Sequence, residues 1–333
     1  MEYLYEVKCD DLVVNITFAW EGAIAIAQSS DEGALVSHRF PTYTFKKDKA
    51  ISGFFKVLIL EKQFVYNLGV ISPGGAGRNR VLNKKDFLKL SILLPDTDEQ
   101  QKIADCLTSL DELIIAQARK LDALKTHKKG LMQQLFPREG ETQPRLRFPE
   151  FQDAGGWVEK TLGSACHMQA GKFVSASEIS DQNVEGLFPC YGGNGLRGYT
   201  TTFTHSGKYP LIGRQGALCG NVKLGFGHFH ATEHAVVATP ENGIAGDWLF
   251  YLLDFLNLNQ YATGQAQPGL SVDVLAKVAI PIPNEETEQQ RIADCLSSLD
   301  ESIAAQTQKL DALKTHKKGL MQQLFPSPEE VET

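Results

Sequence analysis

The chain has 333 residues, of which 42% are hydrophobic and 22% are charged. This composition excludes disordered, collagen-like and small disulfide-stabilised proteins, and the length is enough for two domains of roughly 150 residues each. With 33 Lys and Arg against 40 Asp and Glu, the net charge is −7. The totals therefore lack the basic excess that is expected of a protein that binds nucleic acid by itself.

Cysteine usage and the N-terminal sequence predict a cytoplasmic protein. The six cysteines lie far apart and form no C-x-x-C pair, which disfavours a zinc ribbon or a thioredoxin-like site and indicates reduced thiols. The first residues, MEYLYEVKCDD, carry charges where a signal peptide needs an apolar run. No segment has the roughly 18 to 20 apolar residues of a membrane span.

Residues 96–137 are predicted to form one long helix. Apolar residues recur there in steps of 4, 3, 4, 7, 3, 7 and 4, with Gln117 and Lys128 at the skipped positions. The stripe is of the heptad type and, at about 1.5 Å per residue, about 50 Å long. Pro137 is expected to end the helix because proline lacks an N–H. The stripe consists of Ile103, Leu107, Leu110, Ile114, Leu121, Leu124, Leu131 and Leu135.

The middle of the chain is predicted to be a connector followed by an α+β domain. Residues 138–156 are rich in Pro, Gly and charge, which is typical of a connector. From 157 to 283, short apolar runs are punctuated by glycine and followed by one amphipathic segment, DWLFYLLDFLNLNQYA. This pattern favours a strand-rich sheet with a helix.

Segment 1–95 matches the later part of that domain. DDLVVNITFAWEGAIAIAQ corresponds to YPLIGRQGALCGNVKLG, ISGFFKVLILEKQFVYNLG corresponds to GDWLFYLLDFLNLNQYA, and a glycine-rich loop follows in each. The first segment has no counterpart to residues 157–209. Either the chain begins inside this domain, or the domain is a shortened version whose sheet another chain completes.

Residues 284–326 are predicted to form a second long helix, because residues 100–137 recur at 289–326 with only six differences in 38 positions. Two copies this similar are expected to serve the same role. Pro326 is expected to end the second helix as Pro137 ends the first. The second stripe consists of Ile292, Leu296, Leu299, Ile303, Leu310, Leu313, Leu320 and Leu324.

One such stripe alone is typical of an ordinary buried helix, but two copies favour a pair of helices that pack together. The polar positions of the two stripes favour an antiparallel pair over a parallel one. Packed parallel and in register, Lys128 would face Lys317 and Gln117 would face Gln306, with like-charge repulsion and buried polar groups. Packed antiparallel, each polar position is expected to meet a leucine. We therefore predict an α+β protein in which two strand-rich domains are separated by a rod of two long antiparallel helices. The predicted order is a first domain at 1–95, a helix at 96–137, a connector at 138–156, a second domain at 157–283, a helix at 284–326 and a tail at 327–333.

Catalytic and metal-binding patterns are weak. The chain has no G-x-x-x-x-G-K-[ST] loop and no HExxH helix, so we expect the histidines near one another in the second domain to face a surface or groove rather than a metal. Acidic residues precede both long helices and are best explained as caps favoured by the helix dipole. The histidines are His205, His228, His230 and His234, and the acidic residues are Asp96, Asp98, Glu99, Glu285, Glu286 and Glu288.

These motifs resemble the specificity (S) subunit of type I DNA restriction-modification enzymes over the whole chain, with a shortened first target recognition domain. The repeated E-Q-Q-[KR]-I-A-D-C-L-x-S-L-D segment, continuing to K-K-G-L-M-Q-Q-L-F-P, is similar to that family's conserved helices. The F-P-E-F…G-W-V-E-K-T-L-G, Y-G-G-N-G-L-R-G-Y, L-I-G-R-Q-G-A and I-P-I-P segments are similar to its target recognition domains.

The resemblance implies a non-catalytic DNA-recognition subunit that recognises a bipartite, asymmetric DNA sequence, one half with each domain. The helices would set the spacing and dock two methyltransferase (M) subunits, and restriction (R) subunits would join the complex. This chain would bind no cofactor itself, with S-adenosylmethionine in the M partner and ATP and Mg²⁺ in the R partner. Half-sites on one face of the duplex would lie roughly 34 to 36 Å apart. Two alternatives are a truncated scaffold or half-specificity protein that dimerises through its helices, and a nuclease that uses the histidines.

Candidate DNA-contacting residues lie in the glycine-rich loops of both domains. Arg can bind guanine through two hydrogen bonds, and Asn or Gln can bind adenine in the same way. Neither domain is strongly basic, so we expect the chain alone to bind DNA weakly. The candidates are Arg78, Asn79 and Arg80 in the first domain, and Tyr191, Asn194, Arg197, Arg214, Gln215, Gln265 and Gln267 in the second.

Overall fold

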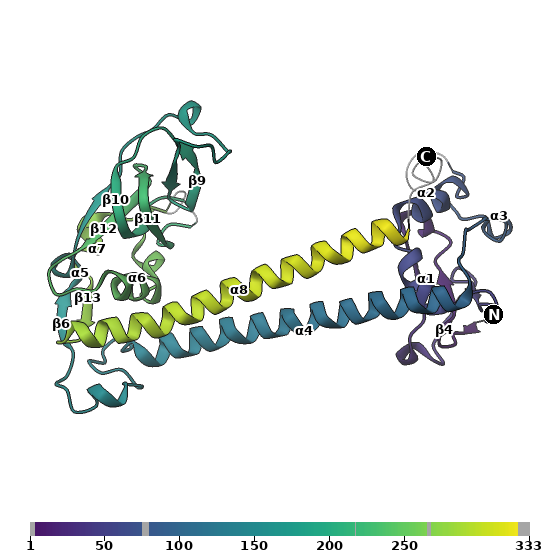
Figure 1. The fold of residues 1–333 in the computed structure, drawn as a ribbon, viewed down its shortest axis with the longest axis horizontal. Coiled ribbons are helices and arrows are strands. Elements are labelled where there is room, and N and C mark those ends of the chain that lie inside the picture. Colours follow the sequence, from purple (N-terminus) through teal and green to yellow (C-terminus); the bar gives the residue numbers. More distant parts are fainter. Residues whose placement is uncertain (1–3, 75–79, 217, 265–267, 326–333) are drawn as a thin grey trace. The chain divides into compact units, whose positions relative to one another are not determined.

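The computed structural model describes residues 4–74, 80–216, 218–264 and 268–325 (Figure 1). The chain forms two compact units. Unit 1 contains residues 1–120 and 306–333, and unit 2 contains residues 121–305, so each long helix contributes residues to both. Among the described helices, none combines the length and the apolar character that crossing a membrane requires.

Unit 1 is built on a small antiparallel sheet of strand order β3-β2-β5. Leu12 lies opposite Ile26 on one side and Tyr43 on the other. The alternate residues Leu12, Val14, Ile24 and Ile26 are buried, so one face of the sheet forms the core. A separate two-stranded sheet pairs β1 with β4. The strands are β1 (Tyr5–Glu6), β2 (Leu12–Val14), β3 (Ile24–Ile26), β4 (Leu35–Val36) and β5 (Thr42–Tyr43).

Three short helices follow the strands of unit 1. The first buries Phe54 and Phe55 in the same core as β2 and β3. The third is capped by Asn83, the residue before its first turn. The side-chain oxygen of Asn83 accepts hydrogen bonds from the backbone N–H groups of Lys85 and Asp86. The helices are α1 (Ser52–Leu58), α2 (Lys62–Val70) and α3 (Lys84–Phe87).

Unit 2 contains a six-stranded sheet of order β7-β12-β10-β11-β8-β9 and a separate pair, β13 with β6. All neighbours are antiparallel except β11 and β8, which are parallel. The central order β11-β10-β12 repeats β3-β2-β5 of unit 1. The matched sequence segments contain β2 and β3 and parts of their counterparts β10 and β11, whereas β5 and β12 lie outside them. The strands are β6 (Val158–Thr161), β7 (Cys166–Ala170), β8 (Phe188–Gly192), β9 (Gly195–Thr200), β10 (His205–Gly213), β11 (Val222–Ala231), β12 (Ala235–Pro240) and β13 (Ala279–Ile282).

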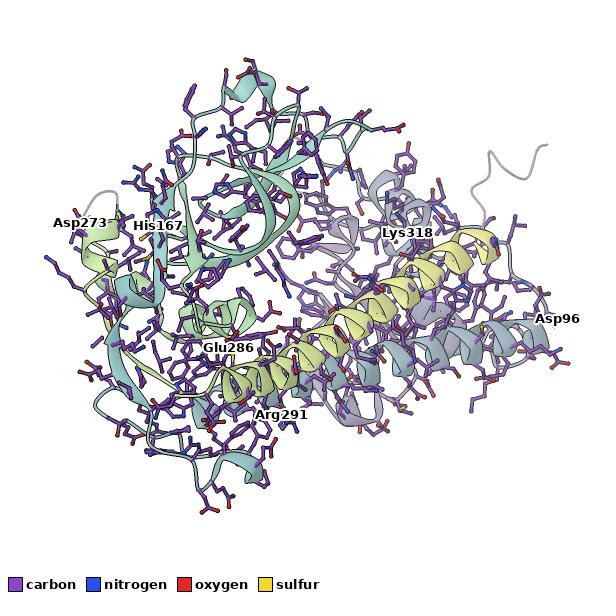
Figure 2. The ribbon with its side chains drawn as sticks, turned by 60° about the vertical axis from the view of Figure 1, so that its left-hand side comes forward. Asp96, His167, Asp273, Glu286, Arg291 and Lys318 are labelled. Carbon is purple, nitrogen blue, oxygen red and sulfur yellow. The ribbon has the colours of Figure 1, made fainter. Side chains whose placement is uncertain are left out.

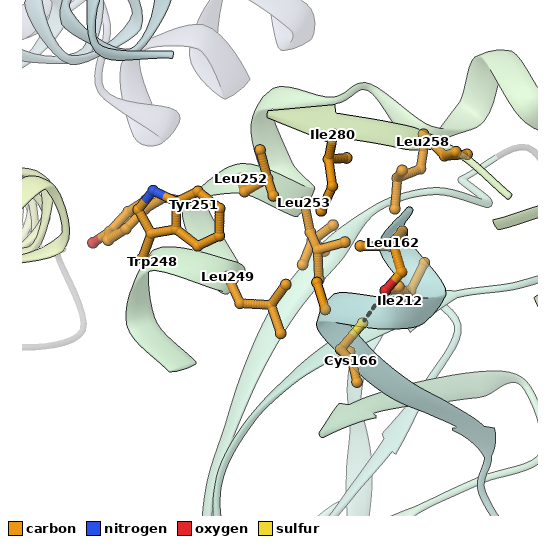
Figure 3. Packing of buried hydrophobic residues seen from close by; sticks show 14 of the residues in the cluster. Leu162, Cys166, Ile212, Trp248, Leu249, Tyr251, Leu252, Leu253, Leu258 and Ile280 are labelled. Carbon is orange, nitrogen blue, oxygen red and sulfur yellow. Dashed lines mark hydrogen bonds between the residues drawn. The ribbon is translucent and has the colours of Figure 1, made fainter. Parts of the chain in front are cut away.

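The core of unit 2 forms around α6 (Gly246–Phe255), which packs against β10 and β11 (Figure 1). Trp248, Leu249, Leu252 and Leu253 of this helix are all fully or almost fully buried, as Figure 3 shows. Cys166 donates a 3.5 Å hydrogen bond to the carbonyl of Leu162 there, and burial, with a smaller effect of Glu241, raises the pKa of its thiol to about 12. The short helices α5 (Leu162–Ala165) and α7 (Val272–Leu275) complete the unit.

The long helices α4 (Thr97–Leu135) and α8 (Glu286–Leu324) have 39 residues each. In unit 1, Asp111 contacts Lys317 and Gln117 contacts Gln306. Residue numbers thus rise along one helix as they fall along the other. The prediction of an antiparallel pair is confirmed.

The prediction that each polar position meets a leucine is wrong. The Nζ of Lys317 lies 2.6 Å from Asp111, and in unit 2 the Nζ of Lys128 lies 2.6 Å from Asp300. The two repeats are offset by 189 residues, so Lys128 is equivalent to Lys317 and Asp111 to Asp300, and the antiparallel helices form the same ion pair twice. In each pair the flexible lysine side chain reaches a carboxylate that lies beside the apolar stripe of the other helix. Equivalent residues meet at Gln117 and Gln306, whose amides hydrogen-bond at 2.7 Å.

The apolar stripes of both helices are buried or half-buried over their whole length. Their outer residues do more than join the two helices. Ile103 and Leu107 belong to the core of unit 1, and Leu135 and Ile292 belong to the core of unit 2. The middle of each stripe therefore packs against the other long helix, and the ends of each stripe pack into the cores of the two units.

A buried glutamine near the start of each long helix holds the domain to it. Gln100 accepts a hydrogen bond from the N–H of Ile51 and donates to the carbonyls of Lys49 and Pro95. Gln289, at the equivalent position, accepts from the N–H of Ala245 and donates to the carbonyls of Gly243 and Pro283. The side chains are 0% and 1% exposed. These matching contacts show that α1 of unit 1 corresponds to α6 of unit 2.

We expect Gln289→Leu to lower the free energy of unfolding of unit 2 by about 3 kcal/mol, because it leaves one buried N–H and two carbonyls without partners. Urea unfolding followed by circular dichroism measures the change. Gln290→Leu is the matched control, since its side chain is exposed and, among the described residues, bonds Asp294 four residues on. It should change stability by less than about 0.5 kcal/mol. Equal effects of the two substitutions would contradict this role for Gln289.

The acidic residues at the starts of the long helices have two different roles, helix capping and ion pairing. Asp96 accepts a 2.8 Å hydrogen bond from the N–H of Glu99 and caps α4 as predicted; Figure 2 shows Asp96 and Glu286 at the starts of their helices. Glu288 is instead 1% exposed and binds Arg147 and Trp157. The sequence signal for a cap does not distinguish these cases.

The segment predicted to be a connector belongs to unit 2 and packs against α8. Arg147 donates from Nε and Nη2 to the two oxygens of Glu288, each at 2.7 Å, and these bonds raise the pKa of the guanidinium. Arg291 of α8 stacks on Phe148 at 4.4 Å and pairs with Glu150 at 3.0 Å. These contacts attach the segment before β6 to the first turns of α8.

Candidate nucleic-acid interface

An open groove of about 480 Å³ lies at one end of the sheet of unit 2. The turn between β8 and β9, the loop after β10 and the turn before β12 form its walls. Three of the predicted DNA-contacting residues, Asn194, Arg197 and Gln215, line it together, and all three are exposed. The other lining residues are Gly192, Gly193, Gly195, Leu196, Gly216 and His234.

Glycines explain how the β8–β9 turn reaches the end of β10. Gly192 pairs with Gly195, so Gly193 and Asn194 form the turn between the strands. Gly195 has a φ of +100°, a conformation that favours glycine. A Cβ at Gly213 would lie 1.9 Å from the carbonyl oxygen of Gly193, so only glycine allows this approach. The close packing presents Asn194 on the same surface as the loop after β10.

Backbone bridges bring a second loop to the groove. Gln215 bridges Gly269, and Gly269 also bridges Thr263. The N–H of Gly216 donates to the carbonyl of Pro268 at 2.9 Å. The ends of the loop that carries Gln265 and Gln267 thus lie beside Gln215, while Gln265 and Gln267 themselves are outside the described residues.

Two predicted DNA-contacting residues of unit 2 do not line the groove. The ring of Tyr191 packs edge-on against Phe229, with centroids 5.7 Å apart, and burial raises the pKa of its hydroxyl. The backbone of Arg214 bonds His234 and Leu270. The Nε of Arg214 is buried and has no hydrogen-bond partner among the described residues.

His234 is a groove residue that sequence reasoning did not assign to DNA contact, and Glu233 is its neighbour in the chain. The Nε2 of His234 lies 3.2 Å from Oε1 of Glu233. The other carboxylate oxygen of Glu233 is buried and has no hydrogen-bond partner within the described part of the chain. His234 lies in the turn between β11 and β12 and packs against Gly193 of the glycine-rich β8–β9 turn. The available sequence signal was its place in a turn between two predicted strands.

The other histidines are held separately, and the expectation that the histidines face a surface or groove is wrong for His230, which is 5% exposed. His230 contacts Thr202 at 3.0 Å and the carbonyl of Lys172 at 3.1 Å. His205 stacks on Phe229 at 5.4 Å, and burial, with smaller effects of His230 and Lys172, lowers its pKa. Among the residues that the structure describes, no group of three or more His, Cys, Asp and Glu side chains could hold a metal ion.

In unit 1, Arg80 is the described member of the predicted DNA-contacting loop, since Arg78 and Asn79 lie outside the described residues. Its guanidinium stacks over the ring of Trp20, 5.5 Å from the centroid. Both side chains line an open cavity of about 600 Å³. The remaining lining residues are Leu60, Lys62, Val65, Tyr66, Gly69 and Val70.

Sequence comparison identifies the family. Residues 3–126 and 154–315 match the type I restriction modification DNA specificity domain. The chain belongs to this family. The architecture of two strand-containing domains joined to paired long helices agrees with that assignment.

Individual relatives support the same family. The type I restriction enzyme EcoprrI specificity subunit of Escherichia coli is 49% identical over 142 residues, 42% of this chain and 35% of the relative. The MjaVIII specificity subunit of Methanocaldococcus jannaschii is 26% identical over 273 residues, 73% of this chain and 63% of the relative. The chain thus spans less than two thirds of both relatives.

The fold is also similar to that of a solved structure. The crystal structure of a type I restriction-modification S subunit from M. genitalium superposes with a TM-score of 0.67 at 17% identity. The match covers 98% of this chain and 85% of that structure.

Proposed function

We propose that this chain is the non-catalytic DNA-recognition subunit of a type I restriction-modification complex. The groove of unit 2 carries the proposal, because it gathers one Arg, one Asn and one Gln on a single open surface. Arg pairs with guanine and Asn or Gln pairs with adenine in the major groove. The surface fits the recognition of a few base edges rather than extensive phosphate contact.

The second half of the target would be recognised by unit 1, which gives a bipartite and asymmetric sequence. The cavity beside Arg80 and Trp20 is the corresponding surface of that unit. The half-sites would be separated by base pairs that neither unit contacts, with the long helices setting the spacing. Because the net charge is −7, most phosphate contacts would come from partner subunits.

The repeated helices are the proposed docking surface for two M subunits. Residues 100–137 and 289–326 differ at six positions only, so two copies of one partner would meet nearly the same side chains. S-adenosylmethionine would be bound by the M subunits, and ATP and Mg²⁺ by R subunits that join the complex. Such a complex would act on DNA in the cytoplasm.

Methylome sequencing of cells that express this chain with its M partner tests the proposal. We expect one methylated motif with two different half-sites and a fixed spacer. Loss of all sequence preference, or a motif unchanged when this chain is omitted, would contradict it. Nuclease activity of the isolated chain with a divalent metal would favour an enzyme instead.

A half-specificity protein that dimerises through its helices is the second candidate. The observation in its favour is that Lys128–Asp300 and Lys317–Asp111 are one pair formed twice. A second copy of α8 could therefore offer Asp300 to Lys317 in place of Asp111. The same methylome experiment separates the candidates, because a symmetric dimer predicts a palindromic motif.

A further inference from the structure

The groove of unit 2 has one apolar side chain among its described lining residues, that of Leu196. The other described lining residues are glycine or polar. Leu196 is 53% exposed and directly precedes Arg197 in β9. A leucine side chain is stabilised when it leaves water for contact with another apolar group. An exposed leucine therefore adds nothing to binding in this groove unless the ligand carries an apolar group.

A β-bulge aims Leu196 and Arg197 into the same groove. Successive side chains of a regular strand point to opposite faces of a sheet. In the β8–β9 ladder, Tyr191 lies opposite Leu196, while the residue before it, Cys190, lies opposite Gly198. Arg197 is thus an extra residue without a partner on β8. Leu196 and Arg197 are both exposed and both line the groove, so the bulge places an apolar and a cationic side chain next to each other.

Backbone contacts on the other edge of β9 hold the bulge in place. Tyr199 and Ser180 each donate a backbone N–H to the carbonyl of the other at 2.8 Å. Gly198 has a φ of +149°, and a Cβ there would lie 2.6 Å from the carbonyl oxygen of Ser180, so only glycine fits. The fold therefore sets the position of Leu196 before any ligand binds.

We propose that Leu196 contacts the C5-methyl group of a thymine, next to the base that Arg197 contacts. The inference rests on the proposed function of unit 2 and adds the identity of one base to it. The thymine methyl is the apolar group that base pairs present in the major groove. The other base edges offer hydrogen-bond donors and acceptors there, with which a leucine side chain cannot pair. One half of the target would then contain a thymine whose methyl group Leu196 covers in the bound complex.

Binding of duplex oligonucleotides to the complex of this chain with its M partner tests the proposal. The duplex carries the motif found by methylome sequencing, and each thymine is replaced in turn by deoxyuridine, which removes only the C5-methyl group. We expect one replacement to weaken binding about fourfold, the effect of exposing one buried methyl group. Leu196→Ala should weaken binding of the thymine duplex by at least as much. The same deoxyuridine should then have no further effect on this variant.

Val184→Ala is the matched control. Val184 is also 53% exposed in unit 2, but it is not among the described residues that line the groove. The substitution should leave the affinity for the thymine duplex unchanged. It should also leave the effect of deoxyuridine as large as in the unsubstituted chain.

Three results would overturn the proposal. The first is that no deoxyuridine replacement weakens binding, or that the motif contains no thymine. The second is that a replacement weakens binding equally with and without Leu196→Ala, because the methyl group then meets another side chain. The third is that Leu196→Ala weakens binding of all sequences equally, as expected of a leucine that inserts between base pairs.

These results are distinguishable from failure of the proposed function. In each of them the complex still prefers its motif, so unit 2 still recognises DNA and only the role of Leu196 is wrong. A complex that prefers no motif would contradict the proposed function itself.

Discussion

Arg197→Ala is expected to lower the rate of target methylation by the proposed complex about 5-fold to 150-fold. This range corresponds to the loss of about 1 to 3 kcal/mol of binding free energy, which is what one side chain paired with a base provides. Arg197 is exposed in the groove of unit 2 beside Asn194 and Gln215, so its removal should not destabilise the fold. If Arg197 contacts one base as proposed, we also expect relaxed specificity at one position of one half-site, because only that base would lose its partner. Rates on oligonucleotides with each base changed in turn measure both effects.

The matched control is Lys160→Ala. Lys160 is exposed in the same unit but lies on β6, paired with β13 and away from the groove lining. It should change the rate less than twofold and leave specificity intact. If Arg197→Ala weakened methylation of all sequences equally, Arg197 would be a phosphate contact instead, and the assignment of base recognition to this groove would be wrong.

The antiparallel helix pair could be predicted from the sequence because two copies of one stripe constrain each other. Like charges at Lys128 and Lys317 disfavour the parallel pair, and that argument needs no structure. The partners of these lysines could not be predicted, because Asp300 and Asp111 lie beside the apolar stripe rather than in it. Which neighbour a flexible lysine reaches depends on the rotation of each helix about its axis, which an apolar period specifies only coarsely.

The composition of the groove could be predicted only in part. Glycine-rich loops indicated Asn194, Arg197 and Gln215 by residue type. Tyr191 was grouped with them, although it belongs to a strand and its ring packs on Phe229. The approach of Gly193 to Gly213 joins residues twenty positions apart through backbone contact, and no periodic pattern records such a contact.

Ion pairs between distant segments were the least accessible feature. Arg147 and Glu288 are 141 residues apart, and each has an ordinary local explanation as a connector charge or a helix cap. Comparison of the two units detects such contacts, which the sequence pattern alone does not reveal. Equivalent positions that differ in burial show where a covering side chain is described in one unit and not in the other. Glu288 against Glu99 and Ile282 against Leu94 are two such differences.

The same comparison supplies a matched pair of variants for the core of unit 2. Trp248 is 0% exposed, with ring centroids 6.3 Å from Phe136 and 6.4 Å from Trp157. Its equivalent in unit 1 is Phe54, which packs on Phe325 at 5.2 Å as Trp248 packs on Phe136. Each unit thus uses an aromatic residue of α1 or α6 to hold the residue that follows the end of a long helix.

Trp248→Ala is expected to lower the free energy of unfolding of unit 2 by about 3 to 5 kcal/mol, because it removes a large side chain from a fully buried site and leaves a cavity. Trp248→Phe should cost much less, about 1 kcal/mol, since a ring remains and the indole N–H, which has no hydrogen-bond partner among the described residues, is no longer buried. Urea unfolding of the full chain, followed by circular dichroism, compares the two. Equal losses for Ala and Phe would show that the indole itself, and not aromatic packing against Phe136, holds the end of α4 to unit 2.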